Sequence, residues 1–269
     1  MKIIIHKNKL INLLDKEKKL GFVPTMGAIH AGHISLIKKC KSQCNKTIVS
    51  IFVNKPQFNR KIDYKKYPQT LNKDIKILKK NRVDYLFIPF FDEMYPNGIN
   101  KKIRINKFGK KLCGKSRPGH FSAVADVIDR FIKIINPNKI FLGNKDMQQL
   151  LIVRDFVKKN HKKVKLVGCK TIRDINGVAL SSRNKLLSKS EMNIASRVYN
   201  FLLSFKWNVI VNRKLLNVAK KKILSFGVKK IDYLELINLN KILYPYKKKK
   251  KNKIFIAYYL GSTRLIDNI

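Results

Sequence analysis

Residues 21–33 read Gly21-Phe22-Val23-Pro24-Thr25-Met26-Gly27-Ala28-Ile29-His30-Ala31-Gly32-His33. An apolar run leads into a turn that contains Pro24 and Gly27, and apolar residues at helical spacing begin at Ile34. The stretch therefore predicts a strand, a tight turn and the start of an α-helix.

Two of the five histidines in the chain, His30 and His33, fall in this one turn, with Gly32 between them. The exposed N–H groups and the positive end of the dipole at a helix N-terminus favour an anion. Imidazoles donate hydrogen bonds to phosphate oxygens, and a glycine lets the backbone approach a ligand closely. A single histidine is more often structural, but this pair at this junction predicts a phosphate-binding turn.

The sequence on either side alternates between strand-like and helix-like segments. Buried strands are predicted at residues 47–53, 84–89, 139–143 and 163–168, and a first strand within residues 1–7 in place of a signal peptide. Helices are predicted around residues 71–78 and 124–135, the second ended by Pro137. This alternation predicts an α/β fold with a Rossmann-like, doubly wound parallel sheet.

The pattern changes after residue 171. Helices are predicted at residues 188–205, where Ser188 and Glu191 have capping-box spacing, and at residues 215–226. Two strands are predicted at residues 231–237 and 254–260. We therefore expect a Rossmann-like domain over residues 1–171 and a second, smaller α+β domain over residues 172–269.

Composition limits the class of protein. Hydrophobic residues make up 45% of the 269 residues, which excludes a wholly disordered chain, and no apolar run is long enough to span a membrane. The net charge is +44, from 60 Lys and Arg against 16 Asp and Glu. This charge is typical either of a nucleic-acid or membrane-surface partner or of a lysine-biased composition; its spread along the chain favours the second. The lysine run at residues 247–251 is either a polyanion clamp or, as we favour, a solvated loop between strands.

The four cysteines have no common zinc-binding spacing. Cys40 and Cys44 are four residues apart on a predicted helix and are expected to share a face, whereas Cys113 and Cys169 stand alone. We expect all four to be reduced, in a cytoplasmic protein.

A series of short motifs resembles one known family. After Pro24 to His33, the matching blocks follow in family order over nearly the whole chain: residues 50–54 with Gln57-Phe58, Tyr67-Pro68, residues 94–96, 117–121, 143–149, 180–184 and 260–268. Each block is weak alone, but together they are specific. The chain resembles the pantothenate synthetase (pantoate–β-alanine ligase) family of H-x-G-H nucleotidyltransferases.

The resemblance implies a two-step, ATP-dependent condensation of (R)-pantoate with β-alanine to pantothenate. Pantoate and ATP would first give pantoyl adenylate and pyrophosphate; β-alanine would then displace AMP. The resemblance also implies Mg²⁺ with ATP, a homodimer, an ATP- and pantoate-binding role for residues 1–171 and a lid role for residues 172–269. No nucleic-acid or membrane partner is expected.

The resemblance also assigns residues. His33 and His30 are the implied catalytic residues, and Gln57 (pantoate and β-alanine) and Gln149 (pantoate) are the implied substrate-binding residues. No metal ligand is assigned, and Asp74 is only a weak Mg²⁺ candidate. Arg117 and His120 are candidates for the wall of the site, with a structural ion pair as the alternative for Arg117. The implied ATP-binding residues are Met26, Gly27, Ala28, Ile29, His30, Ala31, Gly32, His33, Gly143, Asn144, Lys145, Asp146, Ile172, Leu180, Ser181, Ser182 and Arg183.

The chain departs from the family pattern at a few positions. Lys55-Pro56 replace Pro-Thr before Gln57, Ala31 and Asn144 stand where Glu is common, and Lys170 stands where Pro is common. The Lys55-Pro56 departure bears most on the geometry around Gln57.

Two other functions stay open at this point. Another H-x-G-H nucleotidyltransferase would transfer AMP or CMP to a phosphorylated acceptor. A basic nucleic-acid-binding protein would bind with a steep salt dependence.

Overall fold

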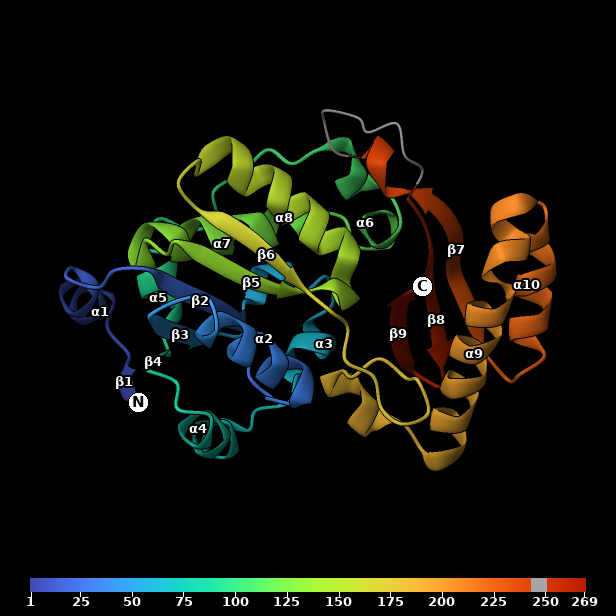
Figure 1. The fold of residues 1–269 in the computed structure, drawn as a ribbon, viewed down its shortest axis with the longest axis horizontal. Coiled ribbons are helices and arrows are strands. Elements are labelled where there is room, and N and C mark those ends of the chain that lie inside the picture. Colours follow the sequence, from blue (N-terminus) through green and yellow to red (C-terminus); the bar gives the residue numbers. More distant parts are fainter. Residues whose placement is uncertain (243–250) are drawn as a thin grey trace. The chain divides into compact units, whose positions relative to one another are not determined.

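The computed structural model describes residues 1–242 and 251–269, in two compact units (Figure 1). Unit 1 comprises Met1–Asn144 and Gln148–Lys170; unit 2 comprises Lys145–Met147 and Thr171–Ile269. The main boundary between the two units thus lies between residues 170 and 171, whereas the sequence predicted a domain boundary between residues 171 and 172. Residues 247–250 of the lysine run lie outside the described residues. No helix in the described part of the chain is long and apolar enough to cross a membrane.

Unit 1 contains the predicted parallel sheet. Every described strand pair in it is parallel, in the order β1-β4-β3-β2-β5-β6. The bounds are β1 (Lys2–Ile4), β2 (Leu20–Thr25), β3 (Lys46–Ile51), β4 (Tyr85–Phe87), β5 (Lys139–Gly143) and β6 (Lys165–Cys169). The strands predicted within residues 1–7 and at 47–53, 84–89, 139–143 and 163–168 are therefore confirmed.

This strand order creates a topological switch point between β2 and β5. From β2 the chain winds outward through β3 to β4, whereas β5 and β6 extend the sheet in the other direction. Ligands of open α/β sheets bind beyond the carboxyl ends of strands at such a point. Those two strand ends are Thr25, just before the two-histidine turn, and Gly143, the first residue of the 143–146 segment.

Helices cover both faces of this sheet (Figure 1). Phe131 of α7 packs on one face, with its ring centroid 5.1 Å from that of Phe22 and 6.2 Å from that of Phe87. The other face buries Val23, Val49 and other residues in one cluster with residues of α2 and α4. The helices of unit 1 are α1 (Lys7–Leu14), α2 (Ala31–Lys41), α3 (Lys61–Lys65), α4 (Leu71–Lys80), α5 (Phe91–Met94), α6 (Cys113–Ser116), α7 (His120–Ile135) and α8 (Met147–Asn160, of which Met147 groups with unit 2).

Local signals set several helix ends. Helix α7 ends before Pro137 as predicted, and Asn136 closes it in the left-handed conformation (φ 49°). Helix α2 ends at Lys41, so Cys44 lies beyond it and not on the helix as expected. Both sulfur atoms still flank Gly21, where a Cβ atom would collide with Cys40 Sγ. All four cysteines are free thiols.

Unit 2 is an antiparallel sheet backed by two helices. Its elements are α9 (Lys189–Val211), α10 (Leu215–Leu224), β7 (Lys230–Asn238), β8 (Asn252–Leu260) and β9 (Thr263–Asn268). The predicted capping box is present: Ser188 Oγ accepts from the Glu191 amide, and the Glu191 carboxylate accepts from the Ser188 amide. Helix α9 runs six residues beyond its predicted end, and β9 was not predicted.

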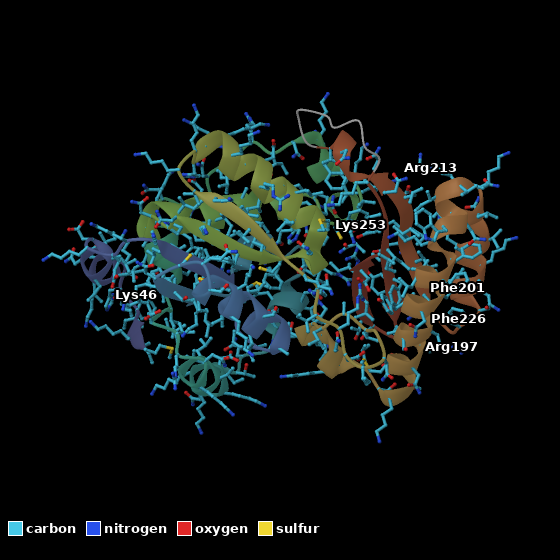
Figure 2. The ribbon with its side chains drawn as sticks, viewed as in Figure 1. Lys46, Arg197, Phe201, Arg213, Phe226 and Lys253 are labelled. Atoms are coloured by element: carbon cyan, nitrogen blue, oxygen red, sulfur yellow. The ribbon has the colours of Figure 1, made fainter. Side chains whose placement is uncertain are left out.

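Aromatic and apolar residues fill the space between the sheet and helices of unit 2. Phe201 of α9 contacts Phe226 edge-on, with ring centroids 5.7 Å apart, and the Arg197 guanidinium lies over the Phe226 ring (Figure 2). Ile254 and Ile256 of β8 are fully buried in the same cluster. This unit therefore has its own core, as an α+β domain requires.

Candidate functional site

The two-histidine turn follows β2 directly. The chain reverses through Gly27 (φ 83°) and Ala28 (φ 51°), both in the left-handed region, and His30 forms the N-cap of α2. The predicted strand, turn and helix start are thus confirmed. The turn presents the N-terminus of α2 at the carboxyl edge of the sheet, where an anion is favoured.

Asp74 holds this turn in place. Its carboxylate accepts from the Ala28 amide (2.9 Å) and the Ile29 amide (2.8 Å), and also from the Thr70 hydroxyl (3.0 Å). The side chain is only 1% exposed. With both oxygens engaged and buried, Asp74 is a structural anchor and not the Mg²⁺ ligand considered from sequence. Its place on the apolar face of α4, among Leu71, Ile75 and Leu78, was the signal that sequence reasoning missed.

The hydrogen bonds of the two imidazoles define what they can offer a ligand. Nδ1 of His30 accepts from the Gly32 amide (3.1 Å), and Nδ1 of His33 accepts from the His30 amide (3.4 Å). A neutral imidazole that accepts at Nδ1 carries its proton on Nε2 and donates there. The rings lie 4.1 Å apart between centroids. Both histidines therefore present an N–H donor from the same turn.

Gln57 is held close to this turn. It ends the short 3-10 helix Lys55–Gln57, which follows β3 and has Pro56 in its first turn. Its Nε2 donates to Met26 Sδ (3.0 Å), and its Oε1 accepts from Asn54 Nδ2 (3.1 Å). The structure therefore brings Gln57 to the predicted ATP loop despite the Lys55-Pro56 departure.

The main chain of Gln57 is clamped by two further residues. Its carbonyl oxygen accepts from Arg117 Nη2 (3.1 Å) and from His120 Nδ1 (2.9 Å), while Arg117 Nη1 donates to His120 Nε2 (3.1 Å). The carbonyl can only accept, so His120 carries its proton on Nδ1. Arg117 and His120 thus act together on the backbone beside the site.

The loop after β5 divides between the two units. Gly143 and Asn144 belong to unit 1, whereas Lys145 and Asp146 group with unit 2. Gln148 is buried: its Oε1 accepts from the Cys113 amide, and its Nε2 donates to the carbonyls of Phe108 and Lys111. Its neighbour Gln149 is half-buried in the first turn of α8. Of the two glutamines, Gln148 is therefore the one committed to the main chain.

A pocket in unit 2 gathers three of the predicted ATP-binding residues. Lys145, Ser181 and Arg183 line it together with Arg264 and Tyr258. Asn268 Nδ2 donates to the Lys145 carbonyl (2.8 Å), and Ser181 Oγ accepts from the Arg183 amide (3.3 Å). Cationic side chains and a hydroxyl suit a phosphate group. Asp267 also lines this pocket, and Lys145 and Arg264 are ion-paired with Asp146 and Asp232, so the positive charge there is partly neutralised.

The remaining predicted ATP-binding residues of unit 2 include Ile172, Leu180 and Ser182, which lie in the same segment of the chain as Ser181 and Arg183 of the pocket. The Ile172 carbonyl accepts from the Leu180 amide (3.0 Å), so these two residues are paired across a short loop. Arg173 secures the loop through a bidentate ion pair with Asp267 (2.6 and 2.9 Å). Burial alone would lower the pKa of Arg173, but the hydrogen bond and charge of Asp267, with smaller contributions from Tyr199 and Asp174, together leave this pKa raised. Ser182 begins the 3-10 helix Ser182–Leu186.

Residues 1–242 and 251–269 contain no group of three or more His, Cys, Asp or Glu side chains arranged to hold a metal ion. An Mg²⁺ ion that enters with a nucleotide needs no such cage, because it keeps several waters and binds mainly through phosphates.

Comparison with known proteins gives a consistent result over the whole chain. Residues 2–269 match the family model described as pantoate–β-alanine ligase. A pantothenate synthetase of Sulfurihydrogenibium sp. (strain YO3AOP1) is 39% identical over 97% of this chain and 95% of that protein. One of Caldicellulosiruptor saccharolyticus is 41% identical over 98% and 96%.

Solved structures agree. A crystal structure of pantothenate synthetase from Thermus thermophilus superposes with a TM-score of 0.90 at 32% identity, covering 100% of this chain and 99% of the other. A pantoate–β-alanine ligase from Francisella tularensis, complexed with β-γ ATP and β-alanine, gives a TM-score of 0.83 at 38% identity, covering 100% and 97%.

Proposed function

Because the chain belongs to the pantoate–β-alanine ligase family, we propose that it condenses (R)-pantoate with β-alanine, consuming ATP and releasing AMP and pyrophosphate. The observation that carries the proposal is the placement of His30 and His33 at the N-terminus of α2, where Nδ1 of each accepts from a backbone amide. Such a pair suits a reaction in which negative charge builds on a phosphate.

In the first step, a pantoate carboxylate oxygen attacks the α-phosphorus of ATP, and the bond to the pyrophosphate oxygen breaks. Negative charge grows on the phosphoryl oxygens and on the leaving pyrophosphate. His30 and His33 offer preorganised donors to this charge, and the dipole of α2 adds to their effect. Asp74 keeps the turn rigid, so the donors need no rearrangement during the step.

In the second step, the amine of β-alanine attacks the carbonyl carbon of the pantoyl adenylate. The amide bond forms, the bond to the AMP oxygen breaks, and the amine loses a proton. We assign pantoate and β-alanine to Gln57 and pantoate also to Gln149. The clamp on the Gln57 backbone supports this assignment, since a fixed amide orients two small substrates better than a mobile one.

We assign ATP binding to residues 26–33, residues 143–146, Ile172 and residues 180–183. Support in unit 1 comes from the position of the turn and of Gly143 at the switch point. Support in unit 2 comes from the shared pocket of Lys145, Ser181 and Arg183. Mg²⁺ enters as part of the MgATP substrate, held through the phosphates.

The proposal also includes the cytoplasm as compartment and a homodimer as assembly. The four free thiols support a reducing compartment. The homodimer rests on the family resemblance, and light scattering of the purified protein tests it.

The test is pyrophosphate release with MgATP, measured with and without pantoate and then with β-alanine added. We expect release that depends on pantoate, AMP formation completed by β-alanine, and a loss of at least about a hundredfold in His33→Ala. His6→Ala is the matched control, because His6 lies on the surface beside Glu93 and should leave the rate unchanged. A folded protein that binds ATP but releases pyrophosphate only with a phosphorylated acceptor would overturn the proposal and indicate another nucleotidyltransferase.

A further inference from the structure

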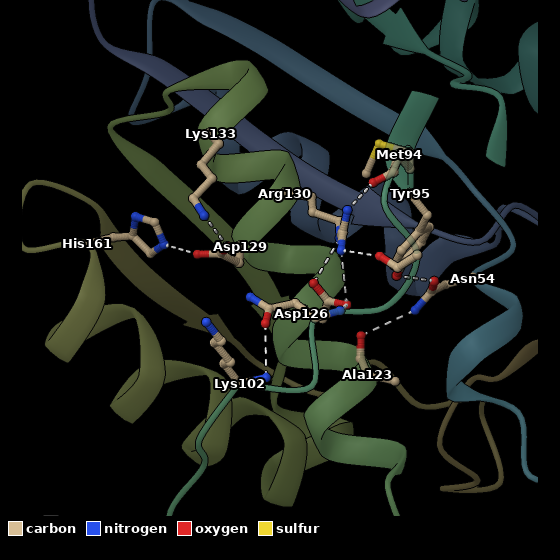
Figure 3. Close-up of polar contacts among 12 residues, drawn as sticks. Asn54, Met94, Tyr95, Lys102, Ala123, Asp126, Asp129, Arg130, Lys133 and His161 are labelled. Carbon is tan, nitrogen blue, oxygen red and sulfur yellow. Dashed lines mark hydrogen bonds and ion pairs between the residues drawn. The ribbon is translucent and has the colours of Figure 1, made fainter. Parts of the chain in front are cut away.

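A continuous chain of contacts runs from α7 to Asn54 (Figure 3) and from Asn54 on to Gln57. It begins at Arg130, whose Nε donates to Asp126 (2.8 Å) and whose two Nη groups donate to the carbonyls of Met94 (2.6 Å) and Gly98 (2.8 Å). These bonds tie the segment after α5 to α7.

Arg130 also holds the ring of Tyr95. Its guanidinium carbon lies 4.2 Å from the centroid of that ring, and Phe91 stacks against the ring at 4.9 Å. Tyr95 is only 4% exposed. The packing of the Tyr95 ring therefore sets the position of its hydroxyl group.

That hydroxyl meets Asn54. Tyr95 OH donates to Asn54 Oδ1 at 2.7 Å. Burial, and next the charge of Asp126, raise the pKa of Tyr95, so the hydroxyl keeps its proton and remains a donor. The Tyr95 hydroxyl can donate or accept, but the Ala123 carbonyl can only accept. The contact of Asn54 Nδ2 with that carbonyl (3.4 Å) therefore places the amide oxygen of Asn54 towards the tyrosine, and the hydroxyl donates to it.

The orientation of Asn54 then determines that of Gln57. Asn54 is 1% exposed, and its Nδ2 donates to Gln57 Oε1 (3.1 Å) and to the Ala123 carbonyl (3.4 Å). With its oxygen engaged by Asn54, Gln57 directs its Nε2 to the thioether of Met26. A thioether is a weak acceptor, and a substrate oxygen replaces it readily.

We propose that Tyr95 is a positioning residue that acts through Asn54 to fix the Gln57 side chain, so that Gln57 presents an N–H donor to an oxygen atom of the substrate. The inference rests on the proposed function, in which Gln57 binds pantoate and β-alanine. This positioning explains how the Gln57 amide can select its ligands. Both substrates carry a carboxylate, and an N–H donor in a fixed position favours an oxygen acceptor.

Tyr95→Phe is the direct test, because it removes only the hydroxyl and keeps the ring under Arg130. We expect KM for pantoate to rise roughly tenfold, since the buried Asn54 oxygen loses its donor. The side-chain amides of Asn54 and Gln57 can then flip by about 180°. KM for ATP should stay within about twofold, because the histidine turn is untouched.

Tyr85→Phe is the matched control. Tyr85 is also buried, and its hydroxyl also donates to one side-chain oxygen, that of Glu17, but the pair is not linked to Gln57. It should lower the melting temperature and leave KM for pantoate unchanged. A comparable KM shift in both variants would show that Tyr95 acts only through general stability and would overturn the proposal.

A double-mutant cycle separates positioning from structure. In the Gln57→Ala background, Tyr95→Phe should produce no further rise in KM for pantoate, because the group that it orients is gone. The same tenfold rise in both backgrounds would overturn the proposal.

A readout that needs no turnover keeps this inference distinct from the proposed function. The two side-chain N–H protons of Gln57, assigned by their loss in Gln57→Ala, should give sharp, separate NMR signals in the wild type and shifted, broadened ones in Tyr95→Phe. Unchanged signals would refute the positioning role whatever the activity. Absent pantoate-dependent turnover in the wild type, with the signals shifting as expected, would refute the proposed function alone.

Discussion

The carboxylate of Asp74 accepts a hydrogen bond from the backbone amide of Ala28 at 2.9 Å, although the two residues are 46 positions apart. The bond spans from α4 to the turn after β2 and holds a residue whose φ angle is 51°. A non-glycine residue in this conformation carries a local cost, so the turn persists only because contacts such as this one oppose it.

Asp74→Asn is predicted to damage both stability and activity. An asparagine offers one oxygen to two amides and turns its NH₂ group against the other, so a charge-assisted bond is lost. We expect the free energy of unfolding to fall by about 2 kcal/mol and pyrophosphate release to slow at least tenfold. Urea unfolding and the pyrophosphate assay measure the two effects. Asp63→Asn, at an exposed acid in the first turn of α3, is the control and should change neither.

Gly32→Ala is predicted to separate activity from stability. A Cβ atom at this position would lie 2.7 Å from Cε1 and 2.8 Å from Nδ1 of His30, so the imidazole must move. Alanine is also a better helix former than glycine by about 1 kcal/mol. We expect an unchanged or slightly higher melting temperature, together with a loss of activity of at least about tenfold. A variant with full activity would show that the observed position of His30 is not the one that the reaction needs.

Asp267→Asn is predicted to destabilise unit 2. It leaves the partly buried guanidinium of Arg173 without its bidentate partner, which typically costs about 3 kcal/mol. The variant Lys159→Met, which breaks the exposed pair between Lys159 and Asp155, should cost less than about 1 kcal/mol. Chemical unfolding of both variants tests the difference. Equal losses would mean that burial does not set the strength of these pairs.

Cys40 is predicted to make stability fall at alkaline pH. Burial raises the pKa of this thiol from 9.0 to about 12, so the folded state holds the proton while the unfolded chain releases it. The contribution of the protonated Cys40 thiol to the free energy of unfolding is therefore complete below pH 9, and it is lost progressively as the pH rises from 9 towards 12. The stability difference between wild type and Cys40→Ala should shrink by about 1 kcal/mol between pH 8 and pH 10. Urea unfolding at the two pH values measures it; a constant difference would contradict the buried, protonated thiol.

Local patterns were sufficient for most of the fold. The buried strand at residues 139–143 and the capping box of Ser188 and Glu191 are found as predicted, because both depend on neighbours in the sequence. Strand β9 was not predicted because its polar residues, including Arg264 and Asp267, hide a strand pattern. Arg264 pairs with Asp232 and Asp267 with Arg173, partners 32 and 94 positions away.

The candidate site shows the same division. His30, Gly32 and His33 were recognised from spacing alone, because a strand, a turn and a helix start are local events. The supports behind them were not. The position of Asp74 among apolar residues of α4 indicates that it is buried, but not that it binds the amide of Ala28. Nothing near Tyr95 indicates that it orients Asn54.

The sequence by itself thus determined most of the strands, several of the helices, the histidine pair at the start of α2 and the family. The tertiary structure decided which buried polar side chains meet across the fold: Asp74 with the turn, Arg117 and His120 with the Gln57 backbone, and Tyr95 with Asn54. The physical reason is that secondary structure follows from periodicities a few residues long. A buried hydrogen bond depends instead on two groups that only the packing of distant elements brings within about 3 Å.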